Sequence, residues 1–318
     1  MTTWSPDPLL EGFECTTIEL PDASVYAGEP EGSLCATLVR RNPPTSRRAM
    51  LYIHGWNDYF FQTHLADEMA ALGYDFHALD LRRYGRSLRQ GQLAGFVTDL
   101  SAYHVEIEEA LRIIRAEDHD QVALMGHSTG GLVAALWAAE NPGAASALVL
   151  NSPWLELQGY PSVRPALLAM FSAVRSLTPT AVLSLSENGF YRRSISATED
   201  GEWNYNLNLK GDKAFSIRVG WLAAIMKGHS KVSAGLSIEA PVAVLISDRS
   251  DFRRKWSEEL RTADIVLDVE TLASRAADLG NLVTLVRIKG GMHDLALSDE
   301  PARSHYFAEL RRWLGAYG

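Results

Sequence analysis

The chain has 318 residues, of which 47% are hydrophobic and 22% are charged, the composition of an ordinary soluble globular protein. Its formal net charge is −9, and no basic cluster is longer than Arg40-Arg41 or Arg82-Arg83, which argues against nucleic acid as a partner. No stretch has the uninterrupted apolar length of a membrane-spanning helix, and the N-terminus lacks the basic and apolar regions of a signal peptide. We therefore expect a soluble, cytoplasmic protein.

The first elements are expected to be strands. Glu14–Leu20 and Ser33–Arg41 predict an antiparallel hairpin at a sheet edge, and the apolar run Ala49–Ile53 predicts a buried strand. The hairpin contains both cysteines, Cys15 and Cys35. Two free thiols in a reducing compartment are favoured over a disulfide between them.

Helices and strands then alternate. Gln62–Leu72 predicts a helix that ends at Gly73, and Asp75–Leu79 predicts a strand. The helix expected over Asp99–Glu117 has apolar residues three or four positions apart, which indicates one buried stripe. Between them, the charged turn Asp80–Ser87 is interpreted as structural, with carboxylate and guanidinium groups that hold loops near the sheet edge.

The stretch from residue 121 to 140 reads QVALMGHSTGGLVAALWAAE and carries the strongest functional signal of the sequence. Its first half predicts a strand buried on both faces, and its second half predicts an apolar helix. Between the two, Gly126-His127-Ser128-Thr129-Gly130 is a G-x-S-x-G motif in a strand–turn–helix context. A serine in such a turn is held in a strained conformation, so the positions two before and two after it must be nearly free of side chains. Both are glycine, and we interpret Ser128 as a nucleophile with the N-terminus of the following helix aimed at an oxyanion beside it.

A candidate oxyanion hole follows from the end of an earlier strand. The strand predicted over residues 49–53 ends at His54-Gly55-Trp56, where the backbone N–H after the glycine points at a substrate oxygen. That N–H belongs to Trp56, and the N–H of Thr129 is its expected partner. His54 is interpreted as a structural histidine that fixes the loop by hydrogen bonding.

Residues 153–238 interrupt the alternation of strands and helices. They contain an apolar segment, Ala166–Leu185, followed by a mixed stretch rich in aromatic residues. An insertion of this size over the carboxyl ends of the strands, where ligands bind, predicts a cap domain on a core formed by residues 1–152 and 239–318. The apolar content of the cap suits an acyl-chain channel or a small core of its own, and it is compatible with transient contact with a membrane surface.

The alternating pattern resumes after the cap. Pro241–Ser247 and Val283–Ile288 predict the last two strands, and helices are expected over about Glu270–Leu279 and Ala302–Leu314. Strands that alternate with helices in this way predict an α/β fold with a mostly parallel, doubly wound sheet.

His293 is the candidate general base. It lies in a glycine-bearing loop after the last predicted strand, where an imidazole can reach Ser128. Of the nine histidines, none of the other eight pairs with a histidine or cysteine at metal-ligand spacing. We therefore expect neither a metal nor a cofactor.

Four motifs together carry a resemblance to a known family. They are His54-Gly55 after a strand, the turn from Asp80 to Gly85-Arg86-Ser87, the GHSTGG segment that begins at Gly126, and Gly290-Gly291-Met292-His293. With them the sequence resembles the α/β-hydrolase superfamily, specifically the lysophospholipase and monoacylglycerol-lipase-like branch of serine hydrolases. The resemblance covers about residues 14–314 and implies a mostly parallel central sheet flanked by helices, an inserted cap, and a triad in the chain order serine, acid, histidine.

The acid of the triad has four candidates: Asp248, Asp251, Asp264 and Asp268. The family usually places the acid directly after a strand, which favours the first two. The family pattern after the acid, an apolar pair followed by Asp and a helix, matches the residues that follow Asp264 instead. Asp264 also leaves 29 residues before His293 (293 − 264 = 29), enough for one helix and one strand, whereas Asp248 leaves 45 (293 − 248 = 45). We expect Asp264 to be the acid, with residues 249–263 as an insertion, and keep the other three as alternatives.

These motifs predict a serine hydrolase that cleaves carboxylic esters through an acyl-enzyme, and the resemblance implies a single-chain acyl ester such as a monoacylglycerol or lysophospholipid. An aminopeptidase or amidase with the same triad is the main alternative. It would need a carboxylate for the substrate amine, for which the cap offers Glu187, Glu199, Asp200 and Glu202. A non-catalytic binding protein on this fold is disfavoured because the serine and the histidine are both present.

Overall fold

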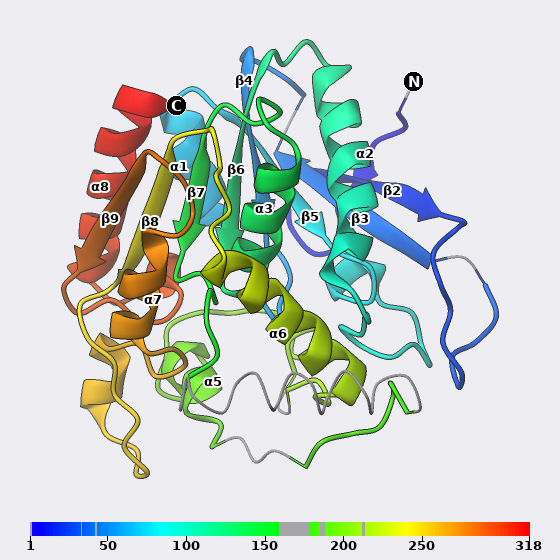
Figure 1. Ribbon diagram of the computed structural model, residues 1–318. Coiled ribbons are helices and arrows are strands. Elements are labelled where there is room, and N and C mark those ends of the chain that lie inside the picture. The colour runs from blue at the N-terminus through cyan, green and yellow to red at the C-terminus, as the bar shows by residue number, and fades with distance from the viewer. Residues whose placement is uncertain (1, 33, 42, 159–177, 185–187, 212–213) are drawn as a thin grey trace.

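The computed structural model describes residues 2–32, 34–41, 43–158, 178–184, 188–211 and 214–318 (Figure 1). Within these ranges one nine-stranded sheet runs in the order β1-β2-β3-β5-β4-β6-β7-β8-β9. Its strands are β1 (Ser5–Pro6), β2 (Phe13–Leu20), β3 (Leu34–Arg41), β4 (Arg48–Ile53), β5 (Asp75–Asp80), β6 (Gln121–His127), β7 (Leu148–Asn151), β8 (Val242–Ser247) and β9 (Val283–Ile288). The pairs from β1 to β5 are antiparallel, and the pairs from β5 through β4 to β9 are parallel.

Helices cover both faces of the sheet. Those described are α1 (Thr63–Ala71), α2 (His104–Arg115), α3 (Thr129–Glu140), α5 (Phe190–Ile195), α6 (Val219–Ser233), α7 (Val269–Ala276) and α8 (Ala302–Tyr317). One apolar core packs α2, α3, α6 and α7 against the sheet, and a second packs α1 and α8 against the opposite face. Figure 1 shows α2 and α3 in front of the sheet and α8 at its left edge. This arrangement confirms the predicted α/β-hydrolase fold.

The alternation of side chains along β6 explains how one strand serves both cores. Val122 and Leu124 belong to the core under α2 and α3, whereas Ala123 and Met125 belong to the core under α1 and α8. Because successive side chains of a strand point to opposite faces, a strand covered on both sides must be apolar at every position. This requirement explains why residues 122–125 are all apolar.

The predicted elements are found with small shifts of their ends. The expected helix over residues 99–117 begins as a 3₁₀ turn, Leu100–Tyr103, before α2, and the Asp99 side chain accepts a hydrogen bond from the Ser101 N–H. The hairpin of β2 and β3 is confirmed, and β1 pairs beside it as a two-residue strand that no sequence pattern indicated. Cys15 and Cys35 in this hairpin are free thiols.

The region expected to be a cap lies at the carboxyl edge of the sheet in its described parts. Figure 1 shows α5 and α6 below the ends of the parallel strands. Trp203 donates a hydrogen bond from Nε1 to the backbone oxygen of Leu297 over 2.7 Å, which ties this region to the core. Of the apolar segment predicted over residues 166–185, positions 166–177 and 185 lie outside the described residues. The cap boundaries, 153–238, stay a prediction. No described helix combines the length and apolar character needed to cross a membrane.

The register of the parallel strands brings their carboxyl ends to one edge. Ile53 of β4 lies opposite Gly126 of β6, and Gly126 lies opposite Leu150 of β7. On the other side of β7, Ser247 at the end of β8 lies opposite Ile288 at the end of β9. The loops that follow these strands therefore meet along a single edge, which is where ligands bind in sheets of this kind.

Candidate active site

Ser128 stands at the sharp turn between β6 and α3. Its backbone has φ 53° and ψ −118°, a strained conformation for a residue with a side chain. A Cβ at Gly126 would lie 2.6 Å from the backbone oxygen of Gly130, so position 126 admits only glycine without movement of the turn. The Ser128 N–H donates to the backbone oxygen of Asn151 over 3.1 Å, which anchors the turn to the end of β7. The serine hydroxyl is thereby carried above the sheet edge.

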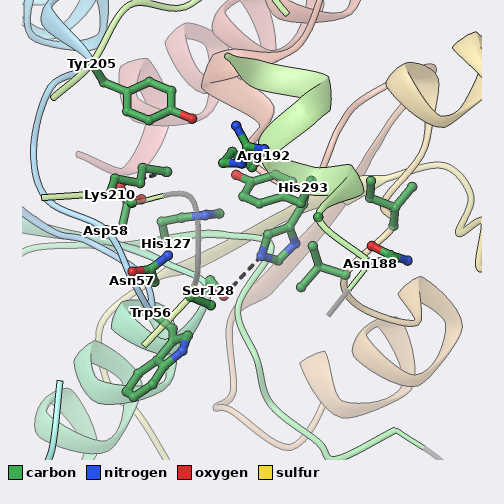
Figure 2. A pocket seen from close by; sticks show the side chains of 16 residues that line it. Trp56, Asn57, Asp58, His127, Ser128, Asn188, Arg192, Tyr205, Lys210 and His293 are labelled. Atoms are coloured by element: carbon green, nitrogen blue, oxygen red, sulfur yellow. Dashed lines mark hydrogen bonds and ion pairs between the residues drawn. The ribbon is translucent and has the colours of Figure 1, made fainter. Parts of the chain in front are cut away.

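Ser128, His293 and Asp264 form one chain of hydrogen bonds. His293 Nε2 lies 3.1 Å from Ser128 Oγ (Figure 2), and His293 Nδ1 lies 2.9 Å from Asp264 Oδ2. Asp264 is fully buried, and its other oxygen accepts hydrogen bonds from the N–H groups of Val266 and Leu267. An Nδ1–H that donates to this carboxylate leaves Nε2 as the acceptor for the serine proton. The structure thus brings together the serine, the histidine and the acid preferred on sequence grounds.

The other three candidate acids have partners elsewhere. Asp248 accepts a hydrogen bond from the Gly290 N–H over 2.9 Å. Asp251 forms ion pairs with Arg249 and Arg253. Asp268 is the N-cap of α7, where it accepts from the Glu270 N–H and the Thr271 hydroxyl. Each of these carboxylates holds a loop or a helix end.

The backbone explains how Asp264, seventeen positions beyond the last residue of β8 (264 − 247 = 17), reaches the strand end. The chain leaves at Arg249, makes an excursion, and returns at Asp264. Two hydrogen bonds close the base of the excursion: the Asp264 N–H donates to the Arg249 oxygen, and the Asp251 N–H donates to the Asp264 oxygen, both over 3.0 Å. The excursion also contacts α5, since the Trp256 ring lies 5.7 Å from the Phe190 ring and 4.3 Å from the Arg193 guanidinium.

The two expected oxyanion-hole residues lie beside Ser128. Thr129 is the first residue of α3, and Trp56 follows Gly55, where an added Cβ would lie only 3.1 Å from Ser128 Cβ. His54 fixes this loop: its Nδ1 lies 2.8 Å from the Gly55 oxygen, and its Nε2 accepts a hydrogen bond from the Leu81 N–H over 3.1 Å. The structural role expected of His54 agrees with these bonds.

The charged turn after β5 is a structural network. The Asp80 carboxylate accepts from the backbone N–H groups of Phe60 and Arg86 and pairs with the Arg86 guanidinium over 2.9 Å. Arg86 also pairs with Asp7. This network joins the turn to the loop after β4 and to the N-terminal segment, which supports the loop that carries Trp56.

A cavity of about 330 Å³ opens beside Ser128 (Figure 2). Its lining includes Ser128 and His293, apolar side chains of Trp56, Ala214, Ile265 and Val266, and polar side chains of Asn57, Asp58, Arg192, Tyr205 and Lys210. Residues of the core and of the expected cap thus share the wall. A substrate with an apolar part and a polar part fits such a lining.

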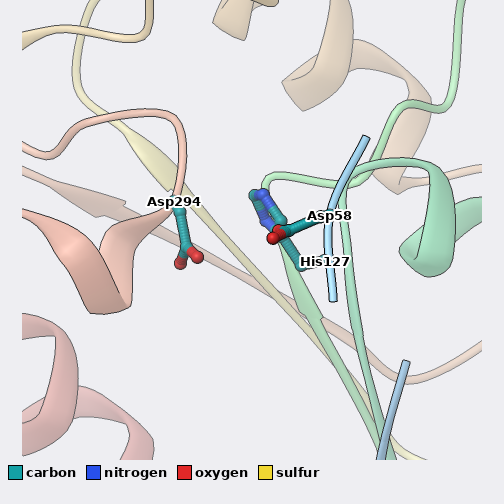
Figure 3. Close-up of side chains that lie close together, drawn as sticks. All are labelled: Asp58, His127 and Asp294. Atoms are coloured by element: carbon teal, nitrogen blue, oxygen red, sulfur yellow. The ribbon is translucent and has the colours of Figure 1, made fainter. Parts of the chain in front are cut away.

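One group of buried side chains in the site was missed by the sequence analysis. Asp58, His127 and Asp294 bring one potential ligand atom each to within 4.8 Å of one another (Figure 3). Such a trio has the geometry to hold a metal ion, and the expectation of no metal rested only on the spacing of histidines and cysteines. Lys210 Nζ lies 2.7 Å from Asp58 Oδ1 and already supplies a positive charge there. The sequence held no spacing signal for this group, because His127 ends β6 whereas Asp58 and Asp294 lie in two loops far from it in the chain.

Burial and charge set the protonation of this group. Burial lowers the pKa of His127, although the nearby Asp294 carboxylate opposes that shift. Burial works to raise the pKa of Asp294, but His127, Lys210 and hydrogen bonds from Asn151 and Gln62 outweigh it and hold that pKa below its ordinary value. Near neutral pH the group therefore contains a neutral imidazole and an ionised carboxylate.

The acidic cap residues considered for amine binding have arginine partners. Glu199 pairs with Arg192, Asp200 with Arg193 and Glu202 with Arg303. Glu187 lies outside the described residues. The carboxylate that does line the cavity is Asp58.

Comparisons with known proteins give a lipase and an acyltransferase among the relatives of this chain. A mycobacterial relative, the monoacylglycerol lipase of Mycolicibacterium smegmatis, is 33% identical over 141 residues, which are 43% of this chain and 48% of that protein. The 1-acylglycerol-3-phosphate O-acyltransferase ABHD5 of Rattus norvegicus is 26% identical over 261 residues, 71% of each chain. The match to the first of these relatives therefore spans about half of its length.

The solved structures agree in fold. The structure of a soluble variant of monoglyceride lipase from Saccharomyces cerevisiae aligns with a TM-score of 0.65 at 14% identity, over 94% of this chain and 99% of that one. The resemblance to monoacylglycerol-lipase-like α/β-hydrolases that the motifs predicted is confirmed. At the level of families, residues 44–297 match Hydrolase_4, described as serine aminopeptidase, S33. This match covers well over half of the chain, which therefore belongs to that family of hydrolases.

Proposed function

We propose that this protein is a serine hydrolase that cleaves carboxylic esters, with Ser128 as nucleophile, His293 as general base and Asp264 as the acid of the triad. The observation that carries the proposal is the continuous chain of hydrogen bonds from Ser128 Oγ through His293 to Asp264. A serine is a weak nucleophile at its ordinary pKa and needs an adjacent, oriented base to attack an ester. His293 is adjacent to Ser128, and Asp264 orients its imidazole.

The proposed reaction proceeds in two halves. His293 Nε2 takes the proton from Ser128 Oγ as the oxygen attacks the ester carbonyl, and the N–H groups of Trp56 and Thr129 stabilise the resulting oxyanion. His293 then gives this proton to the leaving alcohol, and an acyl-enzyme remains. Water, activated by the same imidazole, attacks the acyl group and releases the acid. Throughout, Asp264 keeps the imidazole in the productive tautomer and stabilises its protonated form.

The proposed substrate is a single-chain acyl ester, such as a monoacylglycerol or a lysophospholipid. The cavity supports this class, because its lining combines apolar side chains, such as Ile265 and Val266, with polar ones, such as Asn57 and Tyr205. The names of the mycobacterial and yeast relatives point the same way. The cytoplasmic location expected from the sequence stays a prediction.

The test is hydrolysis of p-nitrophenyl esters from acetyl to palmitoyl by the wild type and by Ser128→Ala. We expect serine-dependent turnover, with kcat reduced by about 10⁶-fold in the variant. An optimum at long chains would identify the apolar wall as an acyl site, and monoacylglycerols would be assayed next. Near wild-type turnover by a pure Ser128→Ala protein would disprove the assignment of the nucleophile.

The aminopeptidase alternative has one observation in its favour, the description of the matched family. It is tested in the same assay with aminoacyl p-nitroanilides. Serine-dependent release of p-nitroaniline in the absence of ester hydrolysis would replace the ester proposal by this one.

A further inference from the structure

We propose that Lys210 determines the substrate specificity of the cavity, because its ammonium group occupies a site that would otherwise receive an organic ammonium ion. The cavity then accepts neutral polar groups and rejects cationic ones. This inference rests on the proposed ester hydrolysis only where substrates are concerned. The binding site itself is a property of the described side chains and does not depend on turnover.

The surroundings of the Lys210 ammonium are those of a cation-binding site. Nζ lies 2.7 Å from Asp58 Oδ1 and faces three aromatic rings, with centroids at 5.0 Å for Phe61, 5.8 Å for Tyr191 and 5.7 Å for Tyr205. A carboxylate combined with aromatic faces is the arrangement by which proteins recognise organic ammonium ions. Here the chain supplies both the receptor and the cation.

This receptor is held by hydrogen bonds and largely shielded from solvent. The side chains of Lys210 and Asp58 are 7% and 2% exposed. Asp58 is held by the Tyr59 N–H over 2.9 Å, and the Tyr59 hydroxyl accepts a hydrogen bond from the Asn206 N–H over 2.7 Å. The turn that begins at Asn206 ends at Lys210, whose N–H donates to the Asn206 oxygen over 3.1 Å. The two halves of the ion pair are therefore tied to each other through the backbone as well.

The charge of the cavity wall explains the rejection of cations. Among the described lining residues, the carboxylate of Asp58 is accompanied by two cationic side chains, Arg192 and Lys210. Because Lys210 balances the Asp58 charge and Glu199 pairs with Arg192, the described wall offers no unpaired carboxylate to a second ammonium ion, which would lose its hydration in a site of low polarity without gaining a counter-ion. Without the lysine, Asp58 would be a buried, uncompensated carboxylate that favours any cation able to reach it.

This position of Lys210 separates two chemistries within one family. An aminopeptidase must bind the ammonium group of its substrate near the nucleophile. Here the carboxylate nearest to that role is already paired with a lysine of the same chain. The inference therefore favours esters without a positive charge, and it predicts that removal of one side chain opens an ammonium site.

The first test is a chemical rescue of Lys210→Ala. The atoms removed correspond to n-propylammonium, and 1-propanol is its uncharged counterpart. We expect the Tm of the variant to fall below that of the wild type and to be restored saturably by n-propylammonium chloride, relative to sodium chloride at equal ionic strength. Calorimetric titration should show that 1-propanol binds at least about tenfold more weakly, because it lacks the charge that Asp58 and the rings recognise. Rescue by both compounds alike, or by neither, would overturn the inference.

Lys227→Ala is the matched control. Lys227 also pairs with an aspartate, Asp99, over 2.6 Å, but both side chains are roughly half exposed and lie outside this cavity. Neither this variant nor the wild type should gain stability from n-propylammonium. A gain in either one would show that the effect is a general response to the salt and would overturn the inference.

A second variant keeps the test decisive if Lys210→Ala does not fold. Lys210→Met preserves the apolar stem and removes only the charge. Choline and its uncharged counterpart, 3,3-dimethylbutan-1-ol, are each tested as competitive inhibitors of ester hydrolysis. The inhibition constant of choline divided by that of the alcohol should be about tenfold lower for this variant than for the wild type. An unchanged ratio of the two inhibition constants would contradict the role of Lys210. If the protein hydrolyses no ester, the same ratio is measured by calorimetry, so that failure of the proposed function and failure of this inference remain distinguishable.

Discussion

At the scale of single residues, the choice among four aspartates shows how much depends on local backbone geometry. Asp264 accepts two backbone hydrogen bonds on one oxygen and presents the other to His293. The N–H donors fix the carboxylate, and the carboxylate in turn fixes the tautomer and the ring orientation of the histidine. An acid in this position acts on the reaction through the imidazole, without touching the substrate.

Replacement of Asp264 by Asn should reduce kcat by about 10⁴-fold. The amide has nearly the same shape, but it can donate a hydrogen bond to Nδ1 and so favours the tautomer that cannot accept the serine proton. Steady-state ester hydrolysis measures the change. Asp251→Asn serves as the comparison, since its carboxylate pairs with Arg249 and Arg253. A larger loss of kcat in Asp251→Asn than in Asp264→Asn would show that the acid has been misassigned.

At the scale of secondary-structure elements, Asp268 has a separate task at the start of α7. It accepts hydrogen bonds from the Glu270 N–H over 3.1 Å and from the Thr271 hydroxyl over 2.8 Å. The first N–H groups of a helix have no partner within the helix, and a carboxylate there also interacts favourably with the helix dipole. This residue thus stabilises the helix that connects the acid loop to β9.

Asp268→Ala should lower the free energy of unfolding by about 1 kcal/mol and leave kcat unchanged. The loss arises because the N–H of Glu270 is left without its side-chain acceptor. Urea denaturation gives the change in stability, and the ester assay gives kcat. Asp268→Asn retains an N-cap acceptor and should recover most of the stability. If Asp268→Ala instead abolished turnover with unchanged stability, the residue would have to be reconsidered as the acid.

At the scale of the whole molecule, several buried and half-buried histidines couple stability to pH. Burial lowers the pKa of four of them: His64, His77, His104 and His127. In the unfolded chain the same side chains titrate near their ordinary pKa of about 6.5. Between that pH and the lower folded pKa, the unfolded state binds more protons than the folded state. Stability therefore rises with pH in this range and falls on acidification.

We accordingly expect the free energy of unfolding to decrease between pH 7.5 and pH 5.5. Each of these histidines contributes up to about 1.4 kcal/mol for every unit by which its pKa is displaced. Below about pH 4, carboxylates whose pKa is lowered in the folded state, such as Asp75 and Asp294, add a loss in the same direction. Chemical denaturation at a series of pH values measures the slope. A stability that stays constant or increases on acidification to pH 5.5 would contradict the protonation states assigned here.

Comparison of sequence and structure shows which structural features local sequence patterns can predict. The parallel sheet was predictable because strands buried on both faces, such as residues 122–125, must be apolar throughout. The proximity of Ser128 and His293 was predictable, because a strained turn needs glycines around the serine and the loop after the last strand returns to the same sheet edge. The grouping of Asp58, His127, Lys210 and Asp294 was not predictable, since it is assembled from the end of β6 and three loops far apart in the chain, which no local spacing connects. The two-residue strand β1 is likewise too short to leave a periodic pattern.

The excursion between Arg249 and Asp264 connects the wall of the cavity to the loop that carries Asp264. Its Trp256 packs on α5, and α5 carries Tyr191, which lines the cavity with its ring 5.5 Å from that of His293. A ligand that shifts α5 therefore acts on the loop that supports the acid.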